Sequence, residues 1–205
     1  MVELFLDGGP FMWPILGLFI IGLVFVFERF YALVTITAKT KAFTKNIRDI
    51  LEEEGVEGAL KACDESTSPV AAMFSEALRH FDKGFEKIEK TLDTIGALEM
   101  TYLEKNQIWL STVIVIAPMM GFTGTVAGMV RAFQDIAAAD DMSPAVVATG
   151  ISQALLTTLF GLIVAMIIQI FQNFFLFQID NLVVEMEKNS LDLLDDLENK
   201  NIKKN

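Results

Sequence analysis

The chain has 205 residues, of which 53% are hydrophobic and 21% charged, and its formal net charge is −11. Its 13 Gly and 5 Pro are too few for a collagen-like or low-complexity chain, and the acidic balance argues against a nucleic-acid partner. One cysteine, Cys63, and one histidine, His80, exclude an intrachain disulfide and lead us to expect no metal site. A mean hydropathy of +0.46 is high for a soluble domain of this length.

Three long stretches of the chain carry no charged side chain. They are residues 8–27, 106–130 and 142–179, with lengths of 20, 25 and 38 residues. A transmembrane helix needs ~20 mostly apolar residues, whereas charge-free runs in buried helices of soluble proteins rarely pass ~14. We therefore predict an all-α membrane protein with three transmembrane helices. The flank before the first stretch has two acids and no Lys or Arg, so we expect a retained anchor and not a cleaved signal peptide.

The distribution of Lys and Arg predicts the orientation in the membrane. Of 16 such residues, none lies in residues 1–27, eleven lie in 28–105, one lies in 131–141 and four lie in 180–205. Cytoplasmic segments of membrane proteins are enriched in Lys and Arg. We therefore predict a periplasmic N-terminus, a cytoplasmic C-terminus and long cytoplasmic helical extensions.

These limits divide the chain into six predicted segments. They are a periplasmic N-terminus with the first transmembrane helix (1–29), a cytoplasmic helical segment (30–105), the second transmembrane helix (106–130), a periplasmic loop (131–141), a third transmembrane helix extending into the cytoplasm (142–179), and a cytoplasmic C-terminal helix and tail (180–205).

Two local signals refine the cytoplasmic segment. Ser68 followed by Pro69 predicts the start of a helix, because Ser is a good N-cap and Pro fits the first helical position. No helix breaker interrupts the sequence from Phe85 to Pro118, so we expect one helix that runs directly into the second span.

We expect no enzymatic activity. The sequence from Gly150 to Ala154 differs by one residue from the G-x-S-x-G motif of serine hydrolases, but it lies in an apolar helix, whereas that motif requires a strand, a turn and a helix. The sequence assigns no role to Cys63 or His80.

Small and polar residues stand out inside the second and third spans. Ala117, Gly121, Gly124 and Gly128 share one stripe of the second span, which permits close helix packing. In the third span a polar stripe is formed by Thr149, Gln153 and Thr157, spaced by four, with Ser152 and Thr158 beside them. A polar stripe in hydrocarbon either bonds a neighbouring helix or faces a hydrated path, and the residue types leave both open.

Neither of these two spans contains a carboxylate. A chain that moves protons through them would therefore need a partner to supply the titrating group.

Two motifs resemble a known family. Residues 117–129, Ala-Pro-Met-Met-Gly-Phe-Thr-Gly-Thr-Val-Ala-Gly-Met, resemble the second-span signature of the ExbB/TolQ/MotA family, and residues 150–162 resemble the signature of its third span. Glu28 and Arg29, a candidate ion pair at the boundary of the first span, fit as well. The three-span layout points to the ExbB/TolQ branch and not to the four-span flagellar stators.

The resemblance implies a motor in the bacterial inner membrane. Five copies of such a subunit surround two helices of a bitopic partner similar to ExbD or TolR, which carries a transmembrane aspartate. Flow of H⁺, or alternatively Na⁺, would drive work on the cell envelope through a TonB-like or TolA-like protein, with no other cofactor. The competing class is a membrane scaffold that conducts nothing.

The resemblance also assigns residues. Thr125 and Thr158 match the pore threonines of the family, and Pro118 matches its signature proline. Gln153 stands where ExbB and TolQ commonly have glutamate, and Thr157 stands where they often have alanine. The expected ion pathway is therefore Thr125, Gln153, Thr157 and Thr158, and the expected packing residues are Pro118, Gly121, Gly124, Gly128 and Gly161. The pair Thr157–Thr158 resembles sodium-driven flagellar stators, and neutral oxygens suit a hard cation.

Overall fold

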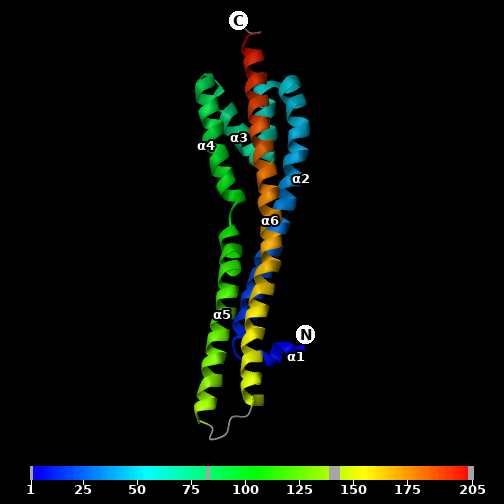
Figure 1. The fold of residues 1–205 in the computed structure, drawn as a ribbon. Coiled ribbons are helices and arrows are strands. Elements are labelled where there is room, and N and C mark those ends of the chain that lie inside the picture. The colour runs from blue at the N-terminus through cyan, green and yellow to red at the C-terminus, as the bar shows by residue number, and fades with distance from the viewer. Residues whose placement is uncertain (1, 82–83, 139–143, 203–205) are drawn as a thin grey trace. The chain divides into compact units, whose positions relative to one another are not determined.

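The computed structural model describes residues 2–81, 84–138 and 144–202, and every regular element within these ranges is a helix (Figure 1). The helices are α1 (Val2–Asp7), α2 (Met12–Glu65), α3 (Pro69–Leu78), α4 (Phe85–Leu103), α5 (Gln107–Ala138) and α6 (Pro144–Ile202). In the described residues, α2, α5 and α6 each contain a stretch long and apolar enough to cross a membrane. The predictions of an all-α chain and of three candidate spans are confirmed.

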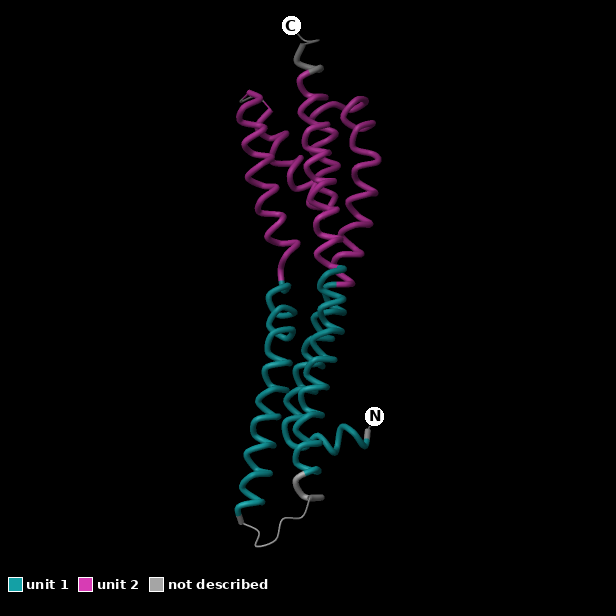
Figure 2. Tube along the Cα trace, in the orientation of Figure 1, with its two compact units in different colours: residues 1–29, 106–174 teal, residues 30–105, 175–205 magenta. Residues whose placement is uncertain are grey.

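The chain forms two compact units (Figure 2). Unit 1 contains residues 1–29 and 106–174, and unit 2 contains residues 30–105 and 175–205. Both α2 and α6 therefore contribute to each unit.

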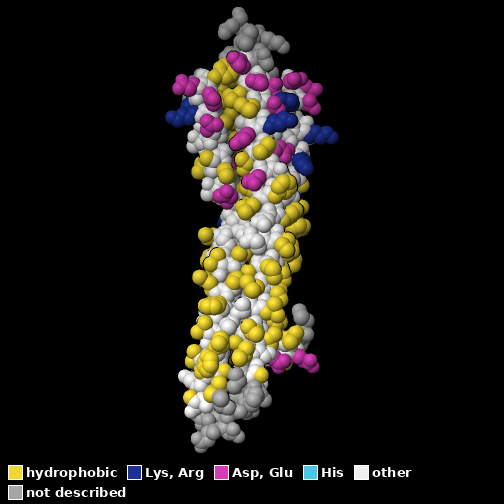
Figure 3. Space-filling view, in the orientation of Figure 1, with side chains coloured by type: hydrophobic (Ala, Val, Ile, Leu, Met, Phe, Trp, Pro, Cys, Tyr) yellow, Lys and Arg dark blue, Asp and Glu magenta, His cyan; other side chains and the backbone are white. Residues whose placement is uncertain are grey.

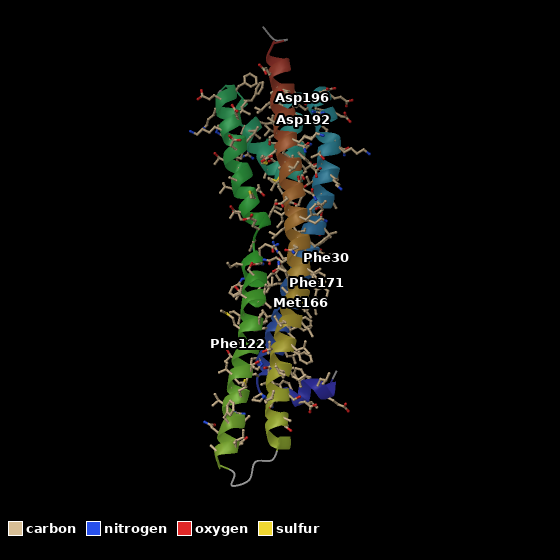
Figure 4. All side chains as sticks on the ribbon, viewed as in Figure 1. Phe30, Phe122, Met166, Phe171, Asp192 and Asp196 are labelled. Carbon is tan, nitrogen blue, oxygen red and sulfur yellow. The ribbon has the colours of Figure 1, made fainter. Side chains whose placement is uncertain are left out.

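Unit 1 is apolar on its outside as well as in its core. Its buried side chains include Ile15, Leu110, Val113, Ala117 and Ile168. Large apolar side chains also face outward, and Phe122 and Met166 are 65% and 57% exposed (Figures 3 and 4). A soluble bundle would expose contiguous apolar area only as limited patches, so this exterior suits contact with lipid hydrocarbon.

Unit 2 is a bundle of amphipathic helices with charged side chains on its surface (Figure 3). Phe43 on α2 and Phe74 on α3 meet edge to face in its core, with ring centroids 6.0 Å apart. On the surface, Arg48 on α2 bridges two carboxylates of α6, with distances of 2.9 Å to Asp192 and 3.3 Å to Asp196. Figure 4 labels both aspartates on α6. The core and the ion pairs together join α2, α3 and the last part of α6.

The predicted start of α3 is confirmed. The Ser68 side chain accepts a hydrogen bond of 3.2 Å from the backbone N–H of Ala71, and Pro69 occupies the first helical position. Serine thereby satisfies one of the N–H groups that a helix start leaves without a partner.

The prediction of an unbroken helix from Phe85 to Pro118 is wrong. Helix α4 ends at Leu103 and α5 begins at Gln107. Between them Asn106 has a φ of 66°, a left-handed conformation that asparagine adopts more readily than most residues. Helix α2 is also interrupted, at Gly55 with a φ of 73°. Because glycine has no Cβ atom, it adopts this left-handed conformation without steric strain.

Candidate functional site

The candidate site begins with a close contact between α5 and α6 in unit 1. A Cβ atom added to Gly121 would lie 2.8 Å from the Thr157 carbonyl oxygen, and one added to Gly161 would lie 2.5 Å from the Ala117 carbonyl oxygen. Both distances are shorter than van der Waals contact, so only glycine allows this approach of the two backbones. A Cβ atom added to Gly124 would lie 2.5 Å from the Thr157 hydroxyl oxygen and 2.8 Å from the Thr157 Cβ atom. The glycine stripe of the second span thus faces the third span of the same chain.

Three threonine hydroxyls meet at this contact. Thr157 on α6 donates to the carbonyl oxygens of Gly121 at 3.1 Å and of Ala154 at 2.7 Å. Thr158 donates to the same Gly121 carbonyl at 3.0 Å. The Thr125 hydroxyl on α5 lies 3.0 Å from the Ala154 carbonyl oxygen and is within hydrogen-bond distance of the Thr158 hydroxyl, so its single proton is donated to one of these two oxygens. Two backbone carbonyls, one from each helix, therefore hold all three hydroxyls.

The three hydroxyls differ in exposure. Thr157 is buried, with 2% of its surface accessible, whereas Thr125 and Thr158 are half-buried at the edge of the α5–α6 contact. Each hydroxyl has one proton to donate and two lone pairs. Each proton is directed at a carbonyl oxygen or at a neighbouring hydroxyl oxygen. The remaining lone pairs of the hydroxyl oxygens can therefore accept a hydrogen bond from water or coordinate a cation. Thr125 and Thr158 therefore join α5 to α6 and also present polar oxygen atoms at the edge of the contact.

Gln153, one turn before Thr157 on α6, contacts the loop between α1 and α2. A Cβ atom on Gly9 would collide with the Gln153 side-chain amide, and Gly9 has a φ of 75°. Helix α1 is attached to α6 as well, because the rings of Phe5 and Phe160 meet edge to face with centroids 6.3 Å apart. The N-terminal segment therefore covers Gln153.

The contact with Gln153 was not predicted from the sequence. The dipeptides Gly8-Gly9 and Gly9-Pro10 signal a turn, but no local pattern says that the turn returns to α6.

Glu28 and Arg29 lie at the other end of the α2 portion of unit 1. The Arg29 guanidinium holds the Glu28 carboxylate with two hydrogen bonds of 2.7 Å, and Arg29 is only 5% exposed. The Asn106 side chain donates to the same carboxylate at 3.2 Å, which connects α2 to the start of α5.

A second polar group joins the start of α5 to α6 within unit 1. The Gln172 amide donates to the Ser111 hydroxyl at 2.6 Å and to the Gln107 carbonyl at 3.4 Å. The Gln107 side chain is buried, and neither of its polar atoms has a hydrogen-bond partner among the residues that the structure describes. The hydrogen bonds of this group span 61 and 65 residues of sequence, so a sequence pattern could not reveal them.

The remaining predicted site residues also lie in unit 1. Pro118 is inside α5, next to the buried Ala117, and Gly128 packs on Ala154, with an added Cβ atom 2.9 Å from its Cβ. Ser152 and Thr149 of the polar stripe are exposed. The structure thus brings Thr125, Thr157 and Thr158 together directly, and it places Gln153 one turn away under the N-terminal loop.

The comparison with protein families identifies the chain. Residues 65–188 match the MotA/TolQ/ExbB proton channel family. The chain belongs to this family. The match includes both spans that form the threonine contact, and the family is one of channels and not of enzymes.

Similar proteins carry names of the ExbB branch. The chain is 29% identical over 187 residues to a biopolymer transport protein ExbB homologue of Methanothermobacter thermautotrophicus, covering 91% of this chain and 66% of that protein. It is 25% identical over 170 residues to an ExbB-like biopolymer transport protein of Synechocystis, covering 82% and 81% of the two chains. Over 93 residues it is 34% identical to the biopolymer transport protein ExbB of Salmonella typhimurium, covering 45% and 36%. The chain thus spans just under two thirds of the Methanothermobacter relative.

Proposed function

We propose that this chain is the ion-conducting subunit of an inner-membrane motor that couples the ion motive force to mechanical work on the cell envelope. The observation that carries the proposal is the group of three threonine hydroxyls at the α5–α6 contact, two of them half-buried, in a member of a proton channel family. A polar surface at membrane depth is costly unless a neighbour or water satisfies it.

The proposed topology has a periplasmic N-terminus and a cytoplasmic C-terminus. Residues 30–105 and 180–205 carry most of the Lys and Arg, and lipid would face the apolar exterior of unit 1. The charged helices of unit 2 would then form the cytoplasmic extensions. Helix α6 has 59 residues, roughly 88 Å at ~1.5 Å per residue, so it exceeds a hydrocarbon core of ~30 Å.

The proposed pathway needs a partner. Residues 106–130 and 142–179 contain no carboxylate, and Gln153 stands where the resemblance to ExbB and TolQ leads us to expect glutamate. We propose that a bitopic protein similar to ExbD or TolR supplies the missing carboxylate, as a transmembrane aspartate next to Thr125 and Thr158. A homopentamer around that partner would place five such threonine pairs around one carboxylate-bearing helix pair. A TonB-like or TolA-like protein would pass the work on to the envelope.

The ion we propose is the proton, with Na⁺ as the alternative. None of the four pathway side chains titrates near neutral pH, so they orient water or coordinate a cation and do not carry protons themselves. One charge crossing 100 mV releases ~2.3 kcal/mol, which is enough for a modest conformational step per passage.

A non-conducting scaffold is the second candidate function. One observation favours it, namely that the donor protons of Thr157 and Thr158 are directed to backbone carbonyls of the same chain. Hydroxyls with such partners can serve helix packing alone.

Thr158→Val tests the proposal, because valine keeps the shape and removes the hydroxyl. We expect the variant to lose energised function in cells that express the partner and to keep its oligomeric size by native mass spectrometry. Retention of full function would favour the scaffold. Thr157→Ala distinguishes Na⁺ from H⁺ as the transported ion. If the chain conducts Na⁺, the variant should require more external Na⁺ for activity. If it conducts protons, activity should follow the pH gradient regardless of Na⁺.

The topology has its own test. Asn181→Cys and Gln134→Cys place thiols at exposed positions, in the proposed cytoplasmic and periplasmic parts respectively. A membrane-impermeant maleimide applied to the periplasmic side should label only the second variant. The wild-type chain, in which Cys63 is buried, is the background control.

A further inference from the structure

A groove in unit 2 is separate from the threonine contact. Its volume is about 490 Å³, and it lies between α4 and the last part of α6, with α3 behind it. The floor is apolar and rich in methionine, and its main side chains are Met73, Leu92, Met100, Met186 and Leu194. Methionine side chains are flexible and polarizable, which suits surfaces that receive a partner side chain.

The spacing of the lining residues gives the groove the length of a short helix. On α4 the lining positions run from Glu89 to Met100, and on α6 they run from Val183 to Leu194. Each run covers eleven steps, or ~16 Å at ~1.5 Å per residue, which is three helical turns. The small residues Gly96 and Ala97 keep the α4 side open. A groove of this length matches a helix that presents apolar side chains at i, i+3/i+4, i+7 and i+11.

The rim of the groove is acidic. Glu89 and Asp93 on α4 and Glu187 on α6 line it, and no Lys or Arg is among its described lining residues. All three carboxylates belong to exposed residues. Figure 3 shows this face, with apolar side chains of α4 and α6 gathered between acidic ones. An occupant with the same negative charge would be repelled, and one with Lys or Arg along its flanks would be attracted.

We propose that this groove is a docking site for a basic amphipathic helix of a partner protein. The apolar face of that helix would contact the methionine-rich floor, and its Lys and Arg side chains would pair with Glu89, Asp93 and Glu187. The occupant is a helix and not a compact ligand because the lining residues follow two helices for three turns. It is basic because the charged side chains among the described lining residues are all carboxylates. The site is independent of the proposed ion pathway, so either assignment can fail without the other.

Peptide binding to the full-length chain in nanodiscs of zwitterionic lipid tests the proposal. The probe is a fluorescent peptide of about five helical turns with leucine on one face and lysine on both flanks. The control peptide has glutamate in place of lysine. We expect saturable binding of the basic peptide by fluorescence anisotropy, weakening as ionic strength rises, and no binding of the acidic peptide.

Rim variants locate the binding. Glu89→Gln/Asp93→Asn/Glu187→Gln should raise the dissociation constant about tenfold at low ionic strength, because three exposed charge pairs are lost. Its matched control is Glu52→Gln/Glu53→Gln/Glu57→Gln, which removes three exposed carboxylates of α2 that do not line the groove. Ala97→Trp should block the groove and abolish binding.

Three results would overturn the proposal. One is equal binding of the basic and acidic peptides, which would indicate a merely apolar surface. Another is an equal effect of the rim and α2 variants, which would indicate attraction to net charge alone. The third is rapid cross-linking between Ala97→Cys chains by a short bismaleimide together with failure of the peptide to bind. That result would show that a second copy of the chain occupies the groove.

Discussion

The backbone of Gly9, in the loop between α1 and α2, lies directly against the side-chain amide of Gln153 on α6. The contact joins the N-terminal segment to the polar stripe of the proposed pathway. It exists because Gly9 has no side chain and adopts a φ of 75°.

Gly9→Ala should detach the loop from Gln153. The added methyl group would meet the amide, and the left-handed backbone costs ~1–2 kcal/mol for a residue with a Cβ atom. We expect faster amide hydrogen exchange over residues 8–12. Gly17→Ala is the matched control, because a Cβ atom there meets nothing within 4 Å. Unchanged exchange in Gly9→Ala would show that the loop does not rest on Gln153.

Gly121→Ala and Gly161→Ala should each destabilise the α5–α6 contact by ~1–3 kcal/mol, because the new methyl groups meet backbone atoms that cannot rotate away. Thermal unfolding in detergent, followed by circular dichroism, measures the loss. Gly17→Ala again serves as control. Equal melting temperatures for all three variants would mean that the glycine stripe faces lipid.

Arg48→Ala should lower the stability of unit 2 by ~0.5–1 kcal/mol, because one guanidinium bridges Asp192 and Asp196 on the surface. The loss should shrink in high salt, which screens exposed pairs. Lys45→Ala removes another exposed cation of α2 and is the control. If urea unfolding shows the same loss for both variants at low and high salt, the ion pairs contribute nothing specific.

Burial, and secondarily the Asp64 carboxylate, raises the pKa of the Cys63 thiol from 9.0 to about 12. At a given pH below 9 its thiolate fraction is then about three orders of magnitude below that of an exposed thiol, and the thiolate is the reactive form. We expect iodoacetamide at pH 8 to alkylate an introduced Ala42→Cys, at an exposed position of the same helix, far faster than Cys63. Reaction of Cys63 should accelerate as pH rises or urea unfolds the chain. Equal native rates would contradict its burial.

Local sequence patterns predicted the elements of this fold that depend on local physics. Charge-free runs gave the three candidate spans, and Ser68-Pro69 gave the start of α3. The break at Asn106 was missed because neither Gly nor Pro marks it, and the left-handed conformation of asparagine is only an occasional choice.

The candidate site was predictable only in part, because local sequence patterns give helix faces and not the contacts between them. A repeat of small residues on α5 and of polar residues on α6 predicts two helix faces, and it does not say that Thr125 meets Thr158. The loop over Gln153 and the pairing of Gln172 with Ser111 depend on contacts between residues far apart in sequence.

The most direct test of the proposed conduction uses the chain and its bitopic partner reconstituted in liposomes that contain a pH-sensitive dye. Under an imposed membrane potential, the wild-type complex should carry protons inward, and Thr125→Val/Thr158→Val should carry none while its native mass stays the same. Ser152→Ala, which removes an exposed hydroxyl from the same stripe of α6, should conduct as the wild type does. Wild-type proton flux in the double threonine variant would contradict the assignment of this threonine pair as the ion pathway.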